Sequence, residues 1–167
     1  EKEILENFYK SNQAEFLAVY GRRRVGKTYL IKQFFARSNC IFFHATGLKD
    51  GNLNEQLSMF VKEIGRVFFK YAPLKVPVSW IDAFELLTAI IQKQSPASKK
   101  LVIFLDELPW MATHKSKLLR ALDYFWNHTW SDNEKFKLII CGSSASWIIN
   151  KVIKDRGGLH NRVTRRI

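Results

Sequence analysis

"YGRRRVGKTYL", residues 20–30, contains two glycines, a lysine and a threonine at the spacing G-x-x-x-x-G-K-T. This spacing is typical of a phosphate-binding loop (P-loop), because Gly21 and Gly26 let the backbone curl until its N–H groups point at phosphate oxygens. In such a loop we expect Lys27 to reach the β- and γ-phosphates of a nucleotide and Thr28 to ligate Mg²⁺. The stretch predicts a nucleotide-binding α/β fold.

The segments on either side of this loop have the patterns that it requires. Residues 15–21 are apolar, as in a buried strand, and residues 25–37 have helical spacing. The positive N-terminus of that helix would face the same phosphates. We expect the side chains of Arg22, Arg23 and Arg24 to point outward, toward solvent, acidic neighbours or a second polyanion. The residues predicted to bind the nucleotide here are Gly21, Arg22, Arg23, Arg24, Val25, Gly26, Lys27, Thr28 and Tyr29.

Near-continuous apolar strands alternate with amphipathic helices along the rest of the chain. This alternation predicts an α/β fold with a parallel sheet covered by helices on both faces. Ser79 and Asp82 have the spacing of a capping box at the start of one helix. The predicted strands are 15–21, 40–47, 101–107, 136–144 and a last one within 162–167. The predicted helices are 25–37, 53–68, one that opens at residue 79, 118–129 and 145–153.

The stretch "LVIFLDELPW", residues 101–110, provides the second half of a nucleotide site. An apolar strand that ends in Asp106 places a carboxylate near the Mg²⁺ shell, which is the Walker B role. Glu107 follows at once and can polarise a water for attack on the γ-phosphate. An Asp-Glu pair alone is often merely solvated, but after a P-loop we interpret it as the metal-binding and catalytic pair.

Three further residues are candidates for the same site. Ser143 and Ser144 end the next predicted strand, in reach of the γ-phosphate or the attacking water, although Gly-Ser-Ser also suits an ordinary turn. Arg162 precedes the last predicted strand and is our candidate for an arginine finger, with Arg165 and Arg166 as competitors and a plain surface charge as the alternative. A finger that acts in a neighbouring subunit would require self-association.

The composition indicates one globular domain. The chain has 167 residues, 47% of them hydrophobic, and no apolar run approaches the roughly 20 residues of a membrane-spanning helix. Cys40 and Cys141 lie in apolar strands and are predicted to be reduced thiols, which suits a cytoplasmic location. The histidines have no metal-ligand spacing, so we expect no metal beyond Mg²⁺. Because the chain begins at Glu1 rather than Met, we expect residues 1–167 to be the P-loop domain of a longer protein.

The net charge of +12 is concentrated in two windows. Residues 22–37 contain six Lys or Arg and no acid, and residues 151–167 contain six with a single Asp. Such concentration marks specific positive sites, so nucleic acid is a candidate partner.

Four motifs together resemble the prokaryotic archaeal-type ATPases, which belong to the AAA+-related STAND group of P-loop NTPases. They are "YGRRRVGKTYLI", "FLDELPWMA", "CGSSASWIINKVI" and "GGLHNRVTRRI", and the resemblance covers essentially the whole chain. It implies a three-layer fold with strand order 5-1-4-3-2 and Asp106 and Glu107 on the third strand. It also implies that Ser143 or Ser144 is the sensor residue and Arg162 the arginine after it. Members of the family often continue into winged-helix and nuclease-like regions.

Three functions are consistent with these observations. The first is an ATPase that uses Mg²⁺ and acts as a conformational or assembly switch, and the second is a nucleic-acid-associated ATPase, similar to origin-recognition or loader proteins. The third is a nucleotide-binding interaction module with negligible turnover, against which Glu107 argues. No Asn-Lys-x-Asp element, the usual guanine reader, occurs in the sequence, so ATP is the expected nucleotide.

Overall fold

The computed structural model of the protein describes residues 1–94, 96, 98–155, 157, 159 and 161–167. Parts of the predicted loop at 95–100, of the basic window 151–167 and of the last resemblance motif therefore lie outside the described residues. The positions concerned are Ser95, Ala97, Arg156, Gly158 and His160.

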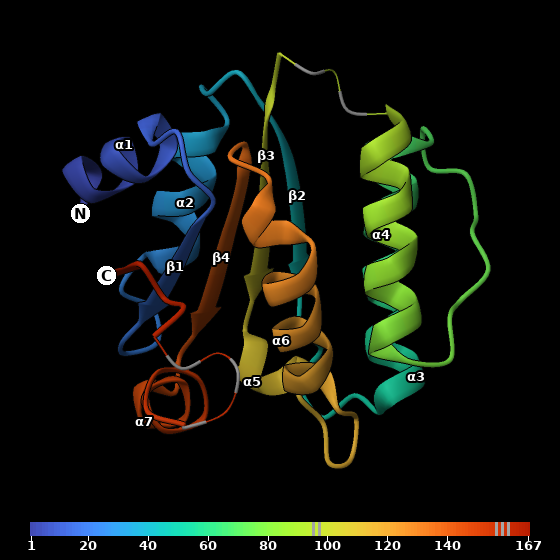
Figure 1. Ribbon diagram of the computed structural model, residues 1–167. Coiled ribbons are helices and arrows are strands. Elements are labelled where there is room, and N and C mark those ends of the chain that lie inside the picture. The colour runs from blue at the N-terminus through green and yellow to red at the C-terminus, as the bar shows by residue number, and fades with distance from the viewer. Residues whose placement is uncertain (95, 97, 156, 158, 160) are drawn as a thin grey trace.

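Five parallel strands form the central sheet in the order β2-β3-β4-β1-β5 (Figure 1). Read from the β5 edge, this order is 5-1-4-3-2. Because all five strands run in the same direction, the loops that follow them gather at one edge of the sheet, where α/β proteins bind ligands. The strands are β1 (Glu15–Tyr20), β2 (Cys40–Thr46), β3 (Lys100–Asp106), β4 (Phe136–Gly142) and β5 (Arg165–Arg166).

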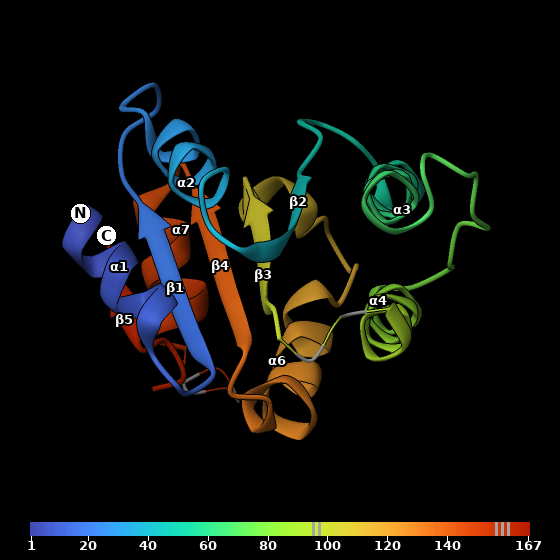
Figure 2. The same cartoon turned by 90° about the horizontal axis from the view of Figure 1, so that it is seen from above.

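Helices cover both faces of the sheet, which confirms the predicted α/β class (Figures 1 and 2). Helices α1 (Lys2–Lys10) and α2 (Lys27–Phe35) pack on one face, and α3 (Leu53–Phe68), α4 (Trp80–Gln94) and α6 (Leu118–His128) lie on the other. Short helical turns follow β3 and β4 and lie at the carboxyl edge of the sheet. They are α5 (Leu108–Met111), α7 (Ala145–Ile148) and the π-helical turn Ile149–Ile153, and a 3₁₀ turn, Trp130–Asp132, follows α6.

The strands are buried on both faces, and this explains their uninterrupted apolar sequences. In β3, Val102 and Phe104 pack with α1 and α2, whereas Ile103 and Leu105 pack with the helices of the opposite face. Every residue of β4 is buried. Sheet and helices therefore pack together beneath the loops at the carboxyl edge.

Polar side chains fix the starts of two helices. Asn52 accepts a hydrogen bond from the backbone N–H of Glu55 at 3.0 Å, and the Glu55 carboxylate accepts from the Asn52 N–H at 2.8 Å, so α3 opens with a full capping box. Ser79 accepts from the backbone N–H of Asp82 at 3.1 Å and so caps α4; the Asp82 carboxylate accepts from the Ser79 hydroxyl at 2.6 Å, so the first half of the predicted capping box is formed.

Two elements differ from the sequence expectation, the helix at the N-terminus and the helix predicted at 145–153. Helix α1 was not predicted, although Leu5 and Phe8 are fully buried on its inner side. The last strand, β5, lies within the predicted range 162–167 and is two residues long, paired with β1. The predicted helix at 145–153 is divided into α7 and a π-helical turn.

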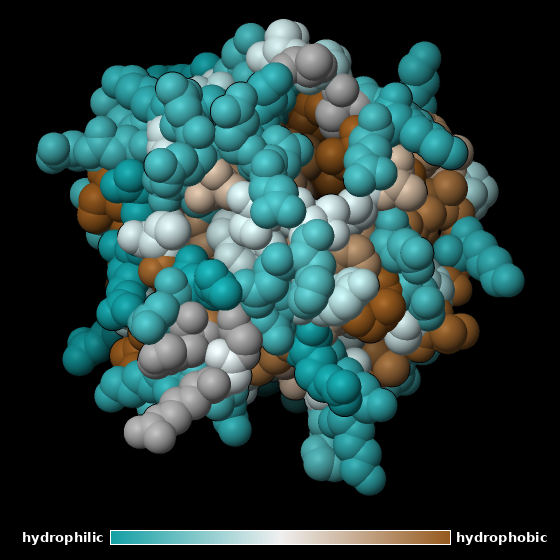
Figure 3. All heavy atoms as spheres, in the orientation of Figure 1, coloured by the Kyte–Doolittle hydropathy of each residue, from teal (hydrophilic) through white to brown (hydrophobic). Residues whose placement is uncertain are grey.

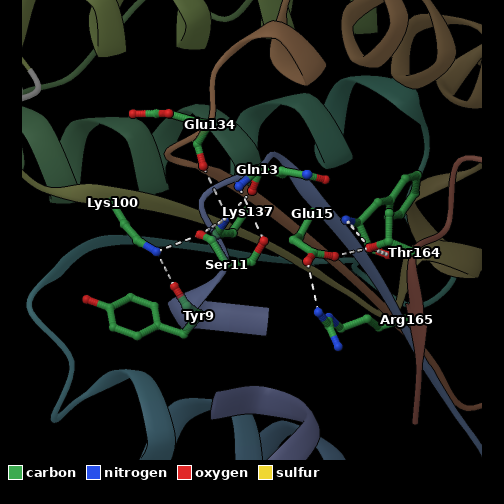
Figure 4. Close-up of polar contacts among 10 residues, drawn as sticks. Tyr9, Ser11, Gln13, Glu15, Lys100, Glu134, Lys137, Thr164 and Arg165 are labelled. Atoms are coloured by element: carbon green, nitrogen blue, oxygen red, sulfur yellow. Dashed lines mark hydrogen bonds and ion pairs between the residues drawn. The ribbon is translucent and has the colours of Figure 1, made fainter. Parts of the chain in front are cut away.

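A buried polar cluster lies where β1, β3 and β4 begin (Figure 4). Lys137 is fully buried, and its ammonium donates to the backbone carbonyls of Ser11 and Glu134, both at 3.1 Å, and of Gln13. The neighbouring Lys100 donates to the same Ser11 carbonyl at 2.8 Å. Burial, reinforced by the Lys100 charge, lowers the pKa of Lys137 from 10.5 to about 8.

The same cluster anchors the last strand to β1. The Glu15 carboxylate accepts a hydrogen bond from the Arg165 guanidinium at 3.0 Å and another from the Thr164 hydroxyl (Figure 4). At the opposite end of β1, the Tyr20 N–H donates to the Ile167 carbonyl at 2.9 Å. Contacts at both ends of β1 therefore hold the 164–167 segment in register.

Polar side chains cover most of the face seen in Figure 3, and apolar ones gather beside α4. In the loop before that helix, Tyr71 and Val78 are 76% and 84% exposed. Among the described residues, no helix has both the length and the apolar character needed to cross a membrane.

Candidate active site

The P-loop has the backbone conformation that its glycines were expected to provide. Gly21, directly after β1, has φ 152°, and Gly26, directly before α2, has φ 86°. Both values lie in the region that favours glycine, and Arg24 between them is also left-handed, with φ 62°. The Gly26 carbonyl accepts the first bond of α2, from the Leu30 N–H at 2.8 Å. The loop thus passes directly into the helix, whose N-terminus faces the loop.

Lys27 lies inside the curl of the loop. Its ammonium donates to the carbonyl of Gly21 at 3.0 Å and to that of Arg22 at 2.6 Å. A cation is therefore held at the centre of the turn, where the phosphates of a bound nucleotide would interact with it.

Thr28 and Asp106 meet although 78 residues separate them in the sequence. The Thr28 hydroxyl donates to Asp106 Oδ2 at 2.8 Å. Because the hydroxyl hydrogen is directed to the carboxylate, the lone pairs of the Thr28 oxygen remain free to face a cation. A hydroxyl oxygen beside a carboxylate is a set of hard donors that fits Mg²⁺.

Asp106 remains ionised in its buried position. Burial raises the pKa of this carboxyl, but hydrogen bonds from His44, Thr28 and Cys141 outweigh that effect, so the net pKa is lowered. The side chain is therefore an anion at neutral pH, as a metal ligand must be.

Glu107 is turned away from the axis of β3 by a left-handed backbone conformation, with φ 49°. Its Oε2 atom accepts two hydrogen bonds from Ser143, one from the backbone N–H at 3.1 Å and one from the hydroxyl at 3.0 Å. Ser143 follows β4, the strand adjacent to β3, so neighbouring strand ends bring the two side chains together. The other carboxylate oxygen, Oε1, is not engaged by Ser143.

An open cavity of about 840 Å³ lies between the P-loop and Glu107. The cavity brings residues of the P-loop and the start of α2 together with Glu107, although they are far apart in the sequence. The lining residues are Arg23, Arg24, Gly26, Lys27, Thr28, Tyr29 and Glu107.

The other candidates are more loosely associated with this cavity. Arg22 and Val25 are exposed and contribute no lining side chain, and Ser144 is the exposed N-cap residue of α7. Arg162 is exposed in the turn before β5. Two residues later, Thr164 bonds to Glu15 at the start of β1, whereas the P-loop follows the end of that strand.

Sequence reasoning missed three residues that contact this site. His44 Nε2 lies 3.5 Å from Asp106 Oδ2, and the Cys141 thiol donates to the same carboxylate. The Arg23 guanidinium lies over the ring of Trp110, 5.1 Å from its centre, a cation–π contact between the P-loop and α5. His44 lies in an apolar strand two residues before its end at Thr46, and this polar position in the strand beside Asp106 was the signal available for it.

The P-loop, the Thr28–Asp106 pair and the adjacent Glu107 define a nucleotide-binding ATPase domain of the P-loop class. Residues 1–166 match the family described as an ATPase domain predominantly from Archaea. The chain belongs to this family, as the sequence resemblance indicated.

Two curated relatives come from Methanocaldococcus jannaschii. An uncharacterised protein is 27% identical over 168 residues, which cover 98% of this chain and 33% of that protein. An uncharacterised ATP-binding protein is 56% identical over 34 residues, 20% of this chain and 58% of that protein. The chain thus spans about a third of the first relative's length.

Solved structures with the same fold include two ORC proteins and a Walker-type ATPase. The Aeropyrum pernix ORC2 protein, in ADPNP and ADP complexes, has a TM-score of 0.61 and 17% identity over 99% of this chain and 44% of its own. A Walker-type ATPase of Pyrococcus abyssi has a TM-score of 0.60 and 18% identity over 99% and 50%. Drosophila ORC bound to AT-rich DNA and Cdc6 has a TM-score of 0.57 and 13% identity over 95% and 51%.

Proposed function

We propose that this domain binds ATP with Mg²⁺ and hydrolyses it, and that it acts as a conformational or assembly switch of the STAND type. The observation that carries the proposal is the meeting of the P-loop with the β3 carboxylates: Thr28 Oγ1 lies 2.8 Å from Asp106, and Lys27 and Glu107 line one cavity. A domain that only bound nucleotide would have no use for Glu107 at that position.

The residues in and beside the cavity have separate roles in phosphoryl transfer. Lys27 and the P-loop N–H groups hold the phosphates, and Thr28 and Asp106 would hold Mg²⁺, which neutralises charge on the transferred phosphoryl group. Glu107 accepts a proton from water as the water oxygen bonds to the γ-phosphorus and the bond to the ADP oxygen breaks. Ser143 fixes Oε2 of Glu107, so that Oε1 is the oxygen available for this proton.

The test is ATP turnover measured by phosphate release, with and without Mg²⁺, together with nucleotide binding. Glu107→Gln should bind ATP as the parent does and lose turnover by at least about a hundredfold, because an amide accepts no proton. Lys27→Ala should lose binding itself. Undiminished turnover in Glu107→Gln, or parental ATP affinity in Lys27→Ala, would contradict the assignment.

A second candidate function is an ATPase that acts on nucleic acid. Arg22, Arg23 and Arg24 are exposed at the P-loop, and DNA is bound by the Drosophila ORC assembly that has this fold. Phosphate contacts release counterions, so DNA affinity should fall steeply as salt rises from 50 to about 200 mM. A DNA titration that leaves turnover and fluorescence anisotropy unchanged at low salt would remove this candidate.

Self-association is the remaining part of the proposal. Because Arg162 is exposed near the start of β1, we expect it to act only on the nucleotide of a neighbouring subunit. Specific activity should then rise with protein concentration in the parent and stay flat in Arg162→Ala. A flat parental curve would leave Arg162 a surface charge.

A further inference from the structure

His44 lies on the edge strand of the sheet, beside the strand that carries the metal-binding carboxylate. In the register of β2 and β3, His44 is paired with Phe104 and Thr46 with Asp106. The imidazole stacks on the Phe104 ring, with 4.7 Å between the centres and 15° between the planes, and its side chain is 12% exposed. The ring is thus held in one orientation before any ligand binds.

The held ring directs one nitrogen at Asp106. His44 Nε2 lies 3.5 Å from Asp106 Oδ2 and 3.1 Å from the Thr46 hydroxyl oxygen. We place the hydrogen of the ring on Nε2, because a lone pair there would face the carboxylate; the ring then donates toward Asp106 and the Thr46 hydroxyl oxygen.

Three groups besides His44 fix the same carboxylate. The Thr28 hydroxyl donates to Oδ2 at 2.8 Å, the Glu107 N–H donates to Oδ1 at 3.0 Å, and the Cys141 thiol donates as well. Thr28 lies in α2 and Cys141 in β4, whereas Glu107 lies directly after β3. His44 is the contact made from β2, and without it nothing described on that strand would hold the carboxylate plane.

We propose that His44 is a positioning residue for Asp106, which it holds in the orientation that Mg²⁺ bound with ATP requires. The inference rests on the proposed function. Groups that hydrogen-bond a metal-binding side chain typically change metal affinity by about 10- to 100-fold when they are removed. The effect should therefore appear in the metal dependence of ATP binding and not in the binding of ATP without metal.

Two variants separate the hydrogen bond from the stacking. His44→Phe keeps a flat ring against Phe104 and loses the donor, whereas His44→Gln keeps an N–H donor and loses the ring. His128→Phe is the matched control, since His128 also stacks on an aromatic ring, at 4.6 Å from Tyr124, but on α6 near the start of β4. Binding of a fluorescent ATP analogue is titrated with Mg²⁺, and also measured in EDTA, with a thermal melt of each protein.

His44→Phe should need about tenfold more Mg²⁺ for half-maximal binding, with affinity in EDTA and melting temperature unchanged. His44→Gln should recover most of the parental Mg²⁺ requirement, and His128→Phe should match the parent. An unchanged Mg²⁺ requirement in His44→Phe, or equal loss with and without metal, overturns the role of His44 alone. Absence of Mg²⁺-dependent ATP binding in the parent would instead overturn the proposed function, and this inference with it.

Discussion

Because Lys137 is buried, the free energy of unfolding changes with pH in the alkaline range. Its pKa is about 8 in the folded protein and 10.5 in an exposed lysine. Below pH 8 the ammonium is charged in both states, so the fold carries the full cost of burying it. Between about pH 8 and 10.5 the folded protein has released the proton and the unfolded chain has not, so the stability contribution rises with pH.

The size of this effect follows from the two pKa values. At about 1.4 kcal/mol for each pKa unit, the cost at pH 7 is about 3 kcal/mol, and most of it has disappeared by pH 10. Lys137→Met removes the charge and retains most of the side-chain volume. The free energy of unfolding of the variant minus that of the parent should therefore fall by about 2 to 3 kcal/mol between pH 7 and pH 10.

The assay is urea unfolding followed by tryptophan fluorescence, because Trp80 and Trp130 are buried in the core. Burial also raises the pKa of Cys40, to about 11, and that of Cys141, so both thiols reduce stability at high pH. These contributions are common to parent and variant and cancel in the difference. Lys93→Met, at an exposed position of α4, is the control and should leave the parental pH dependence unchanged. A difference between Lys137→Met and parent that stays constant from pH 7 to pH 10 would refute the reasoning.

Two further predictions concern the site and a third concerns the packing at the end of β4. Ser143→Ala removes one of two hydrogen bonds to Glu107, so kcat should fall about tenfold with ATP affinity within twofold of the parent; equal kcat would show that the backbone N–H suffices. Thr28→Ala should raise the Mg²⁺ concentration needed for ATP binding while Thr28→Ser restores it, and a failed rescue by serine would argue against the hydroxyl as ligand. In Gly142→Ala the new methyl group would lie 2.9 Å from Pro109 Cδ and 3.2 Å from Ile148 Cδ1, so the free energy of unfolding should drop by about 1–3 kcal/mol. An unaltered urea midpoint would contradict this packing.

The parts of the site that local sequence determines were predictable. The P-loop and the carboxylates of β3 each lie in one short stretch with a fixed spacing, and apolar strands with intervening helices require a parallel sheet that brings the strand ends together. The cavity accordingly joins Lys27 and Glu107, as the motifs implied.

What sequence reasoning missed depends on contacts between strands. The His44–Asp106 contact requires the register of β2 on β3, and a lone histidine within an apolar strand does not reveal that register. Lys137 interrupts an apolar run, but the three carbonyl groups that hold it come from two separate loops. Helix α1 was missed because charged residues are as numerous as apolar ones along it, and its buried Leu5 and Phe8 become evident only against the sheet.

The hydrogen bond from Tyr20 to Ile167 has a consequence for how the nucleotide state can be observed. Tyr20 directly precedes Gly21, so one amide proton joins the last residue of β1 to the segment beyond β5. A rearrangement of the loop that also rotates the backbone of Tyr20 would move the donor, and a loosening of residues 164–167 would remove the acceptor. The deuterium uptake of this single amide therefore reports on the phosphate loop and on the sheet edge at once, and ligands that stiffen either one should slow it.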